Sequence, residues 1–301
     1  MTWNPEALPD LSGRTYAVTG GNGGIGYFIS EQLAAAGAHV IILGRAPRRL
    51  ANAVAAIKQH TGNGEVSTIR LDLADLASVR EAAAELVARG RVDALIENAG
   101  STSPGRARRT TADGFELAVG TNHLGHFALT ALAMPVLAAS DARIVAMGSL
   151  ITRLLPFALD DLLSERRYRE SQAYATSKHA VQSFALELDR RLRAAGSKCT
   201  CLLAQPGFSL DRASPRRANI TEPRSWLRLA APFTQGKDRG AWPAVRAAVD
   251  SEARGGEVYG PSRGAVGRPV PRSAVRADRD PAIAARLWTR SEELTGIEFA
   301  V

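Results

Sequence analysis

Cysteine and long apolar runs are scarce in this chain. The two cysteines, Cys199 and Cys201, cannot make a disulfide framework. They lie two residues apart in a predicted strand, so we interpret them as small buried hydrophobic residues. No apolar run approaches the roughly 18 residues of a membrane span, and the N-terminal stretch is too polar for a signal peptide. We therefore expect a soluble, cytoplasmic protein without a membrane span.

Lysine is also scarce, and arginine carries most of the positive charge. The net charge is +8, yet Lys58, Lys178, Lys198 and Lys237 are the only lysines. The arginines form short clusters, and no long basic tract with interleaved aromatic residues occurs. Nucleic-acid binding is therefore not expected. Binding of a phosphate or an acidic substrate could use part of this charge, and a solvated surface is the alternative.

Short apolar runs alternate with helical segments along most of the chain. Its 301 residues are 45% hydrophobic, which is enough for one large domain. The alternation predicts right-handed βαβ units. We expect an α/β fold in which residues 1–301 form a single doubly wound Rossmann domain. About seven parallel strands would follow the order 3-2-1-4-5-6-7, with helices on both faces. The predicted strands are 16–18, 39–43, 66–71, 92–98, 142–147, 198–203 and 257–259, and the main predicted helices are 47–60, 76–89, 113–139, 173–195 and about 280–295.

A glycine cluster follows the first predicted strand and opens a helix. Free N–H groups and the helix dipole favour an anion at such a turn. Two registers fit the cluster: Gly21-x-Gly23-x-x-Gly26 and Thr19-Gly20-x-x-x-Gly24-x-Gly26. We prefer the second, because Gly20 follows the strand directly and Gly24 then opens the helix. The residues expected to bind the phosphates of a cofactor are Gly20, Asn22, Gly23, Gly24, Ile25 and Gly26.

The carboxyl ends of the next strands face the same crevice in such a sheet. Arg45 ends the second strand, where an acidic residue would bind the ribose of NAD. An arginine suits a 2′-phosphate instead, so NADP is favoured over NAD; a solvated arginine is the alternative. Asp72 follows the third strand and either accepts from an adenine amino group or caps a turn. The other expected cofactor contacts at strand ends are Leu73, Asn98, Ala99 and Gly100.

Two polar side chains are predicted on one face of the long helix 173–195. Tyr174 and Lys178 are four residues apart, so they lie on the same side of a helix. A phenol near an ammonium can give and take a proton if its pKa falls by about 3 from its usual value near 10. Ser149 ends the fifth strand and would face the same crevice. A Tyr-x-x-x-Lys pair alone is a weak signal, and an exposed helix pair is the alternative.

In combination, these motifs resemble the short-chain dehydrogenase/reductase family. The resemblance covers about residues 12–210, and the motifs occur in the family's order. The 25-residue gap from Ser149 to Tyr174 and the Gly-Arg ending of the second strand are similar to the retinol-dehydrogenase-like and protochlorophyllide-reductase-like branches. The motifs are Thr19-Gly20…Gly24-Ile25-Gly26, Asp72-Leu73, Asn98-Ala99-Gly100, Ser149…Tyr174…Lys178 and Pro206-Gly207.

The resemblance implies roles for individual residues. Tyr174 would be the acid/base, Ser149 would hold the substrate oxygen, and Asn122 would anchor a water in the proton relay. Lys178 would bind the nicotinamide ribose and lower the pKa of Tyr174. Tyr174 itself would also contact the cofactor. The remaining implied cofactor contacts are Pro206, Gly207 and Ser209.

Two positions depart from the family pattern. Glu97 stands where a second Asn is usual before Asn98, which questions the local hydrogen bonding of the sheet. Ser209 would replace a Thr that usually follows Pro206-Gly207 and contacts the carboxamide. His123 and His126 are spaced like a metal pair, but no further ligand is suitably placed, so no metal is expected.

The resemblance implies an NADP-dependent oxidoreductase that interconverts an alcohol and a ketone or aldehyde. Its partner would be a small-molecule substrate, and the sequence leaves a homo-oligomer open. Segments about 150–170 and 208–245 should line the pocket, and an apolar substrate suits them, although their apolar residues would equally suit an ordinary core. These residues are Leu154, Leu155, Phe157, Leu162, Leu163, Phe208, Trp226, Leu227, Leu229 and Phe233.

Two other functions compete with this one. A protein that senses NADP(H) without turnover would have no reason to keep Ser149, Tyr174 and Lys178. A lyase or epimerase acting on a nucleotide sugar would need a longer C-terminal part than this chain has.

Overall fold

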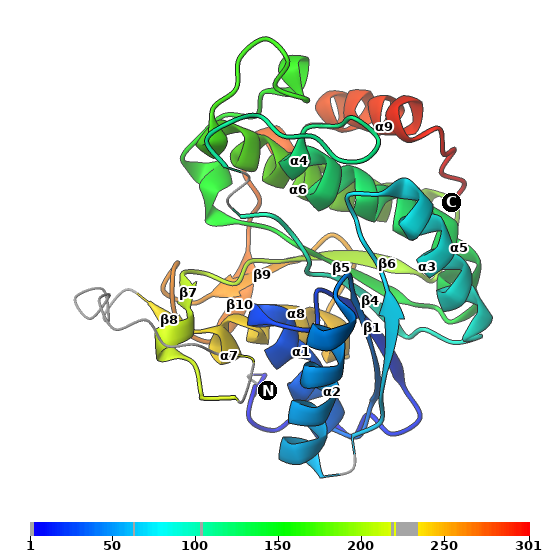
Figure 1. The fold of residues 1–301 in the computed structure, drawn as a ribbon, viewed down its shortest axis with the longest axis vertical. Coiled ribbons are helices and arrows are strands. Elements are labelled where there is room, and N and C mark those ends of the chain that lie inside the picture. The colour runs from blue at the N-terminus through cyan, green and yellow to red at the C-terminus, as the bar shows by residue number, and fades with distance from the viewer. Residues whose placement is uncertain (1–2, 63, 103–104, 218–219, 221–233) are drawn as a thin grey trace.

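A central sheet of eight strands organises the computed structural model, which describes residues 3–62, 64–102, 105–217, 220 and 234–301 (Figure 1). The strand order is β10-β9-β6-β5-β4-β1-β2-β3. Neighbouring strands pair in parallel throughout, except that β10 runs antiparallel to β9. The strands are β1 (Thr15–Thr19), β2 (His39–Gly44), β3 (Val66–Arg70), β4 (Ala94–Glu97), β5 (Arg143–Met147), β6 (Thr200–Ala204), β9 (Val258–Pro261) and β10 (Pro269–Arg272).

The predicted fold class and the order of the seven parallel strands are confirmed. The edge strand β10 was not predicted, because it is short and contains two prolines, which suit only a sheet edge. A separate two-stranded parallel sheet, β7 (Ser209–Leu210) with β8 (Gln235–Gly236), was also not predicted. Each of its strands has two residues, too few for a periodic pattern to show.

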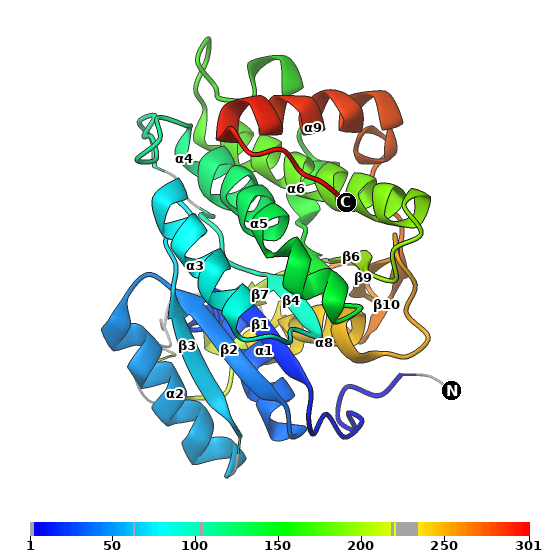
Figure 2. The ribbon, with the colours of Figure 1, turned by 90° about the vertical axis from the view of Figure 1, so that its right-hand side faces the viewer.

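Helices cover both faces of the sheet, as Figures 1 and 2 show. The α1, α2 and α8 helices pack on one face, and α3, α5 and α6 on the other, with α9 outside α6. The strands supply both cores by alternation: Ile41 faces the α3/α5/α6 side, whereas Val40 and Ile42 face the α1/α2 side. The helices are α1 (Gly24–Ala35), α2 (Pro47–Thr61), α3 (Leu76–Ala88), α4 (Leu117–Val119), α5 (Gly125–Ala139), α6 (Glu170–Ala194), α7 (Lys237–Gly240), α8 (Trp242–Val249) and α9 (Pro281–Thr295).

The helix predicted over 113–139 begins later than expected and contains an irregular turn. It begins at Leu117, and residues Gly120–Leu124 form a π-helical turn between α4 and α5. Pro135 lies inside α5, which continues past it to Ala139, so the proline does not divide the helix. Single π-turns inside helices are frequent at functional sites, and this one carries Asn122.

Aromatic side chains attach the C-terminal part to the core. Trp288 of α9 packs between Phe184 and Phe299, with ring centroids 5.7 and 4.8 Å away, and Phe127 lies 5.5 Å from it. The Arg191 guanidinium lies 4.0 Å above the Trp288 ring. These contacts hold α9 against α5 and α6. Among the described residues, no helix combines the length and the apolar character that crossing a membrane requires.

Replacing Trp288 tests how much this cluster stabilises the fold. Because the ring is 2% exposed and fully surrounded, Trp288→Ala should lower the free energy of unfolding by about 3–5 kcal/mol. Urea denaturation followed by circular dichroism measures the change. Leu154→Ala is the control, since that side chain is 76% exposed and should cost less than about 0.5 kcal/mol. Equal effects of the two substitutions would contradict this account of the core.

Candidate active site

A cavity of about 850 Å³ opens at the carboxyl ends of β1, β2, β3 and β4. It lies at the switch point between β1 and β4, where the sequence predicted the cofactor site. It brings together most of the predicted cofactor residues, which come from four separate strand ends. Those lining it are Gly20, Asn22, Gly23, Gly24, Ile25, Arg45, Asp72, Leu73, Asn98, Ala99, Gly100 and Ser209.

The backbone of the glycine loop favours the second of the two registers. Gly24 opens α1 with φ +58°, in the region that favours glycine. A Cβ on Gly26 would overlap Gly20 O and Asn98 Nδ2, so the helix can approach β4 only with glycine there. Gly23, which the first register requires, is extended at φ 179°, and its nearest neighbour is 3.5 Å from where its Cβ would lie. The free N–H groups of α1 therefore point into the cavity from Gly24 onward.

The ends of β2 and β3 bring positive and negative side chains to the cavity. Arg45 lines it, and so does Arg49 from the first turn of α2. Arg48 does not line it. Asp72 also lines the cavity, and its Oδ1 accepts from Ala74 N at 3.0 Å. Asp72 therefore caps a turn and still faces the site, so both of its predicted roles remain compatible with the geometry.

The end of β4 is held by hydrogen bonds to β1 and to the π-turn. Asn98 Nδ2 donates to Thr19 O at 2.9 Å, and the Thr19 hydroxyl accepts from Ala99 N at 2.9 Å. His126 Nδ1 lies 2.9 Å from Asn122 O, which can only accept, so Nδ1 carries the hydrogen and Nε2 accepts from Thr19. Burial lowers the pKa of His126 to about 4 and keeps it neutral.

His123 and His126 therefore have separate structural partners. His123 Nε2 lies 2.8 Å from the hydroxyl of Ser291 in α9, far along the chain from the partners of His126. Burial also lowers the pKa of His123, to about 3. In the part of the chain that the structure describes, no group of three or more possible metal ligands occurs.

Ser149 and Tyr174 meet at the carboxyl end of β5. Tyr174 lies in the second turn of α6, and its hydroxyl donates to Ser149 Oγ at 3.4 Å. Burial raises the pKa of Tyr174, and the hydrogen bond with Ser149 opposes the rise. Burial by itself disfavours the phenolate, so the lowered pKa that the resemblance implied, with Lys178 and the nicotinamide as its source, stays a prediction.

Lys178 is buried one turn beyond Tyr174. Its Nζ donates to Met147 O at 2.8 Å. Burial lowers the pKa of Lys178 to about 8, and the charge of Glu97 opposes the shift. Glu97 is 3% exposed, and its Oε1 accepts from Thr130 Oγ1 at 2.5 Å. Burial raises the pKa of Glu97 to about 7, against the Thr130 hydrogen bond and the Lys178 charge.

Glu97 leaves the sheet intact, contrary to the doubt that its identity raised. It pairs in register with Ala146 of β5. The Glu97 side chain points away from the strand pairing and toward Thr130 and Lys178. Having glutamate instead of asparagine at this position therefore places a carboxyl group behind the predicted catalytic lysine.

Asn122 links the cavity wall to α6. Its Oδ1 accepts from Ser101 N at 2.6 Å, and its Nδ2 donates to Ser101 O and to Ser177 Oγ at 3.1 and 2.9 Å. Its carbonyl accepts from His126, as described above. The side chain therefore holds the strand end beside Gly100 at a fixed distance from the helix that carries Tyr174.

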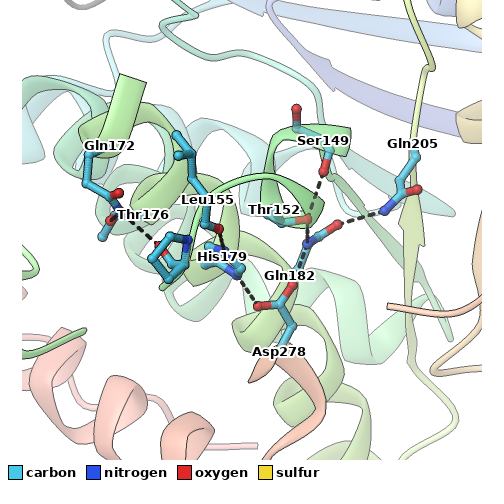
Figure 3. Close-up of polar contacts among 10 residues, drawn as sticks. Ser149, Thr152, Leu155, Gln172, Thr176, His179, Gln182, Gln205 and Asp278 are labelled. Atoms are coloured by element: carbon cyan, nitrogen blue, oxygen red, sulfur yellow. Dashed lines mark hydrogen bonds and ion pairs between the residues drawn. The ribbon is translucent and has the colours of Figure 1, made fainter. Parts of the chain in front are cut away.

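A buried polar network braces the loop that follows Ser149 (Figure 3). Gln182 Nε2 donates to Thr152 Oγ1 at 2.9 Å and to Asp278 Oδ2 at 2.5 Å, and the Thr152 hydroxyl donates to Ser149 O at 3.0 Å. Sequence reasoning missed this network, because Asp278 lies 96 positions from Gln182. In effect, the C-terminal segment supports the backbone of the predicted catalytic serine.

His179 extends this brace from the position next to Lys178. Its Nδ1 lies 2.5 Å from Asp278 Oδ1, its Nε2 lies 2.8 Å from Leu155 O, and the Phe157 ring stacks on it at 5.2 Å. Burial opposes the charged form of His179, but the hydrogen bonds to Asp278 and Leu155 O outweigh it and raise the pKa. His179 Nε2 donates to Leu155 O, which can only accept, and Nδ1 pairs with Asp278, so the ring fixes the loop between Ser149 and Phe157.

The segment after β6 supplies one wall of the cavity. Ser209 lines it, but its hydroxyl donates to Pro206 O at 2.9 Å. Asp211 and Lys237 also line the cavity, and the sequence analysis had selected neither. No local sequence motif marks Asp211 or Lys237. They come near the glycine loop only because the chain returns to it after β8.

The predicted pocket segments divide into core and surface. Leu162 and Leu163 are buried in the core, whereas Leu154 and Phe208 are 76% and 52% exposed. Trp226, Leu227, Leu229 and Phe233 lie outside the described residues. A second cavity of about 360 Å³ adjoins the loop after Ser149. Its lining is Leu150, Arg153, Leu154, Gln205, Gly260, Pro261, Gly264 and Arg272.

Comparison with known proteins gives matches along the whole chain. The family model described as short chain dehydrogenase matches residues 14–210. Polyprenol dehydrogenase of Mus musculus is 36% identical over 310 residues, covering 98% of this chain and 87% of that protein. Retinol dehydrogenase 13 of Homo sapiens is 36% identical over 299 residues, covering 96% and 86%. A solved structure of an uncharacterised protein from Mycobacterium paratuberculosis is 35% identical, with a TM-score of 0.81 over 100% of both chains.

The buried carboxyl group of Glu97 makes a prediction about stability and pH. Its folded pKa of about 7 exceeds the ordinary 4.5, so the folded protein holds a proton that the unfolded chain releases between these values. This contribution is complete below about pH 4.5 and is lost as pH rises through 7. From pH 5 to 7.5, the free energy of unfolding of the wild type should therefore fall relative to that of Glu97→Gln by on the order of 2 kcal/mol.

Urea denaturation at the two pH values measures this difference. Glu85→Gln is the matched control, because Glu85 is exposed on α3 and pairs only with Arg89. That variant should follow the wild type at both pH values. A Glu97→Gln variant that also follows the wild type would show that Glu97 is ionised throughout.

Proposed function

The chain belongs to the short chain dehydrogenase family, whose members are NAD(P)-dependent oxidoreductases acting on CH–OH groups, and we propose that it uses NADP to interconvert an apolar alcohol and its carbonyl compound. The observation that carries the proposal is the contact of Tyr174 with Ser149 at the carboxyl end of β5. It puts two hydroxyl groups within reach of one substrate oxygen, with a buried lysine one helical turn away.

The cavity residues fit a dinucleotide. The N-terminus of α1 faces the cavity with glycine at each close approach, and cations approach it from α2 and from the segment after β8. Gly20 to Gly26 would hold the diphosphate, and Asn98 to Gly100 would lie along the nucleotide. Asp72 would face the adenine, and Pro206, Gly207 and Ser209 would border the nicotinamide end. When bound, the cofactor supplies the hydride.

The residues of this chain supply the proton and hold the substrate. Ser149 and Tyr174 donate hydrogen bonds to the carbonyl oxygen, where negative charge develops during reduction. The raised pKa of Tyr174 keeps its hydroxyl protonated until that oxygen takes the proton. Lys178 would hold the ribose of the cofactor and return a proton toward Tyr174, and Asn122 keeps Ser101 and α6 in register beside it.

The choice of NADP rests on the end of β2. Arg45 and Arg49 line the cavity at the position where an acidic residue would select NAD. Two guanidinium groups favour a 2′-phosphate, which NAD lacks.

The choice of an apolar substrate rests on the second cavity and on the relatives. Leu150, Leu154 and Pro261 give this cavity an apolar wall directly after Ser149. Two relatives over nearly the whole chain are named polyprenol dehydrogenase and retinol dehydrogenase. We take a long or bulky apolar alcohol as the substrate class, with its chain in the second cavity.

Tyr174→Phe tests the assigned acid. The substitution keeps the ring but removes the proton, so kcat should fall by about 10²–10⁴ while the Kd of NADPH stays within about twofold. The assay follows NADPH absorbance with a panel of apolar aldehydes and ketones. Tyr259→Phe is the control, since its hydroxyl bonds to Glu257, which directly precedes β9 at the amino ends of the parallel strands. Near-full activity of Tyr174→Phe would refute the assignment; tight NADPH binding without turnover of any substrate would favour a sensor.

Arg45→Ala tests the preference for NADP. Loss of a charge-assisted hydrogen bond to the 2′-phosphate should weaken NADPH binding by about 1.5–3 kcal/mol and leave NADH binding unchanged. Fluorescence titration gives both dissociation constants. Arg48→Ala is the matched control from the same cluster, because Arg48 does not line the cavity. If wild-type protein binds NADPH and NADH equally, the choice of NADP is wrong.

A further inference from the structure

Lys237 and Asp211 occupy equivalent positions in the small sheet of β7 and β8. The two strands run parallel, with Ser209 opposite Gln235 and Leu210 opposite Gly236. Asp211 follows β7 and Lys237 follows β8, and their side chains form an ion pair at 2.7 Å. Both residues line the large cavity. The small sheet therefore presents a paired cation and anion to the site.

Several contacts fix Lys237 beside α1. Its backbone N donates to Ser214 Oγ at 2.8 Å, and Gln32 Nε2 of α1 donates to Asp238 O at 2.8 Å. The bond from Gln32 ties α7 to α1 across 206 positions of sequence. The Lys237 side chain is 23% exposed, so it is largely packed rather than extended into solvent.

The ammonium group of Lys237 lies over the first residue of α1. Its Nζ is 3.7 Å from the point that a Cβ on Gly24 would occupy. Arg49 approaches the preceding residue, with its Nη2 3.5 Å from the corresponding point on Gly23. Two cations from distant parts of the chain thus converge on consecutive residues of the glycine loop, where the dipole of α1 already favours an anion.

We propose that Lys237 binds the diphosphate of the nucleotide, an inference that rests on the proposed function. The first residue of α1 is where the free N–H groups and the helix dipole meet a diphosphate. Arg45 and Arg49 come from the end of β2 and the start of α2, and they serve the 2′-phosphate. Lys237 comes from the other wall of the cavity and touches the loop one residue further into α1.

The pairing of Lys237 with Asp211 would affect diphosphate binding in a second way. The Asp211 carboxylate lines the same cavity and would repel a diphosphate if it were unpaired. Lys237 neutralises this carboxylate with one N–H of its ammonium group. The other two N–H groups remain available to the nucleotide. Removing the lysine therefore takes away an attractive charge and exposes a repulsive one.

Direct binding of nucleotides to full-length protein tests the inference without a substrate. Lys237→Gln should raise the Kd of NADPH and of NADH by the same factor, about ten- to a hundredfold, because both carry the diphosphate. Lys237→Arg keeps the charge and should stay within about fivefold of the wild type. Lys198→Gln is the matched control, since Lys198 pairs with Asp141 on the surface. This variant should bind both nucleotides as the wild type does.

The outcomes separate this inference from the proposed function. Unchanged dissociation constants in a folded Lys237→Gln variant, checked by circular dichroism, would overturn it. A loss confined to NADPH would place Lys237 on the 2′-phosphate and would also overturn it. Failure of the wild-type protein to bind either nucleotide would instead refute the proposed function.

Discussion

A buried ammonium group sets the geometry on which the candidate active site depends. Lys178 cannot reach bulk water, so its hydrogen bond to Met147 O fixes α6 at one height above β5. Glu97 of β4 places a carboxyl group near it, and the charge of that group raises the pKa of Lys178 against burial. Ser149 lies two residues beyond Met147, and Tyr174 lies one turn before Lys178. The same constraint therefore determines how closely their hydroxyl groups approach.

The sequence was informative where a feature depends on neighbouring residues. Strand, glycine turn and helix recur with local signals, so the strand order and the position of the cavity followed from them. The glycine register could also be chosen, because Gly20 and Gly24 have a positive φ that Gly23 lacks. The π-turn at Asn122 gave no such signal, since a helical pattern of apolar residues does not distinguish one extra residue in a turn.

Features that depend on distant residues were not predictable. Lys237 reaches Gly24, and Asp278 reaches His179 and Gln182, only because separate parts of the chain return to the same edge of the sheet. The effect of burial was also hidden. Tyr174 and Lys178 were correctly expected on one helix face, but burial raises the pKa of Tyr174 in the folded chain. The identity of Glu97 suggested that the sheet is disturbed there. In the structure the sheet is intact, and the Glu97 carboxyl group interacts with Lys178 through its charge.

The brace around Ser149 has a consequence for the order in which the protein is made. A chain leaves the ribosome from its N-terminus, so β1 to β4 and the glycine loop emerge before Ser149 and Tyr174. The loop between Ser149 and Tyr174 is secured by Asp278, which emerges later still. A ribosome must therefore translate beyond Asp278 before Ser149 can be held in place. Translation that stops before Asp278 would release chains that contain the glycine loop but lack a braced serine.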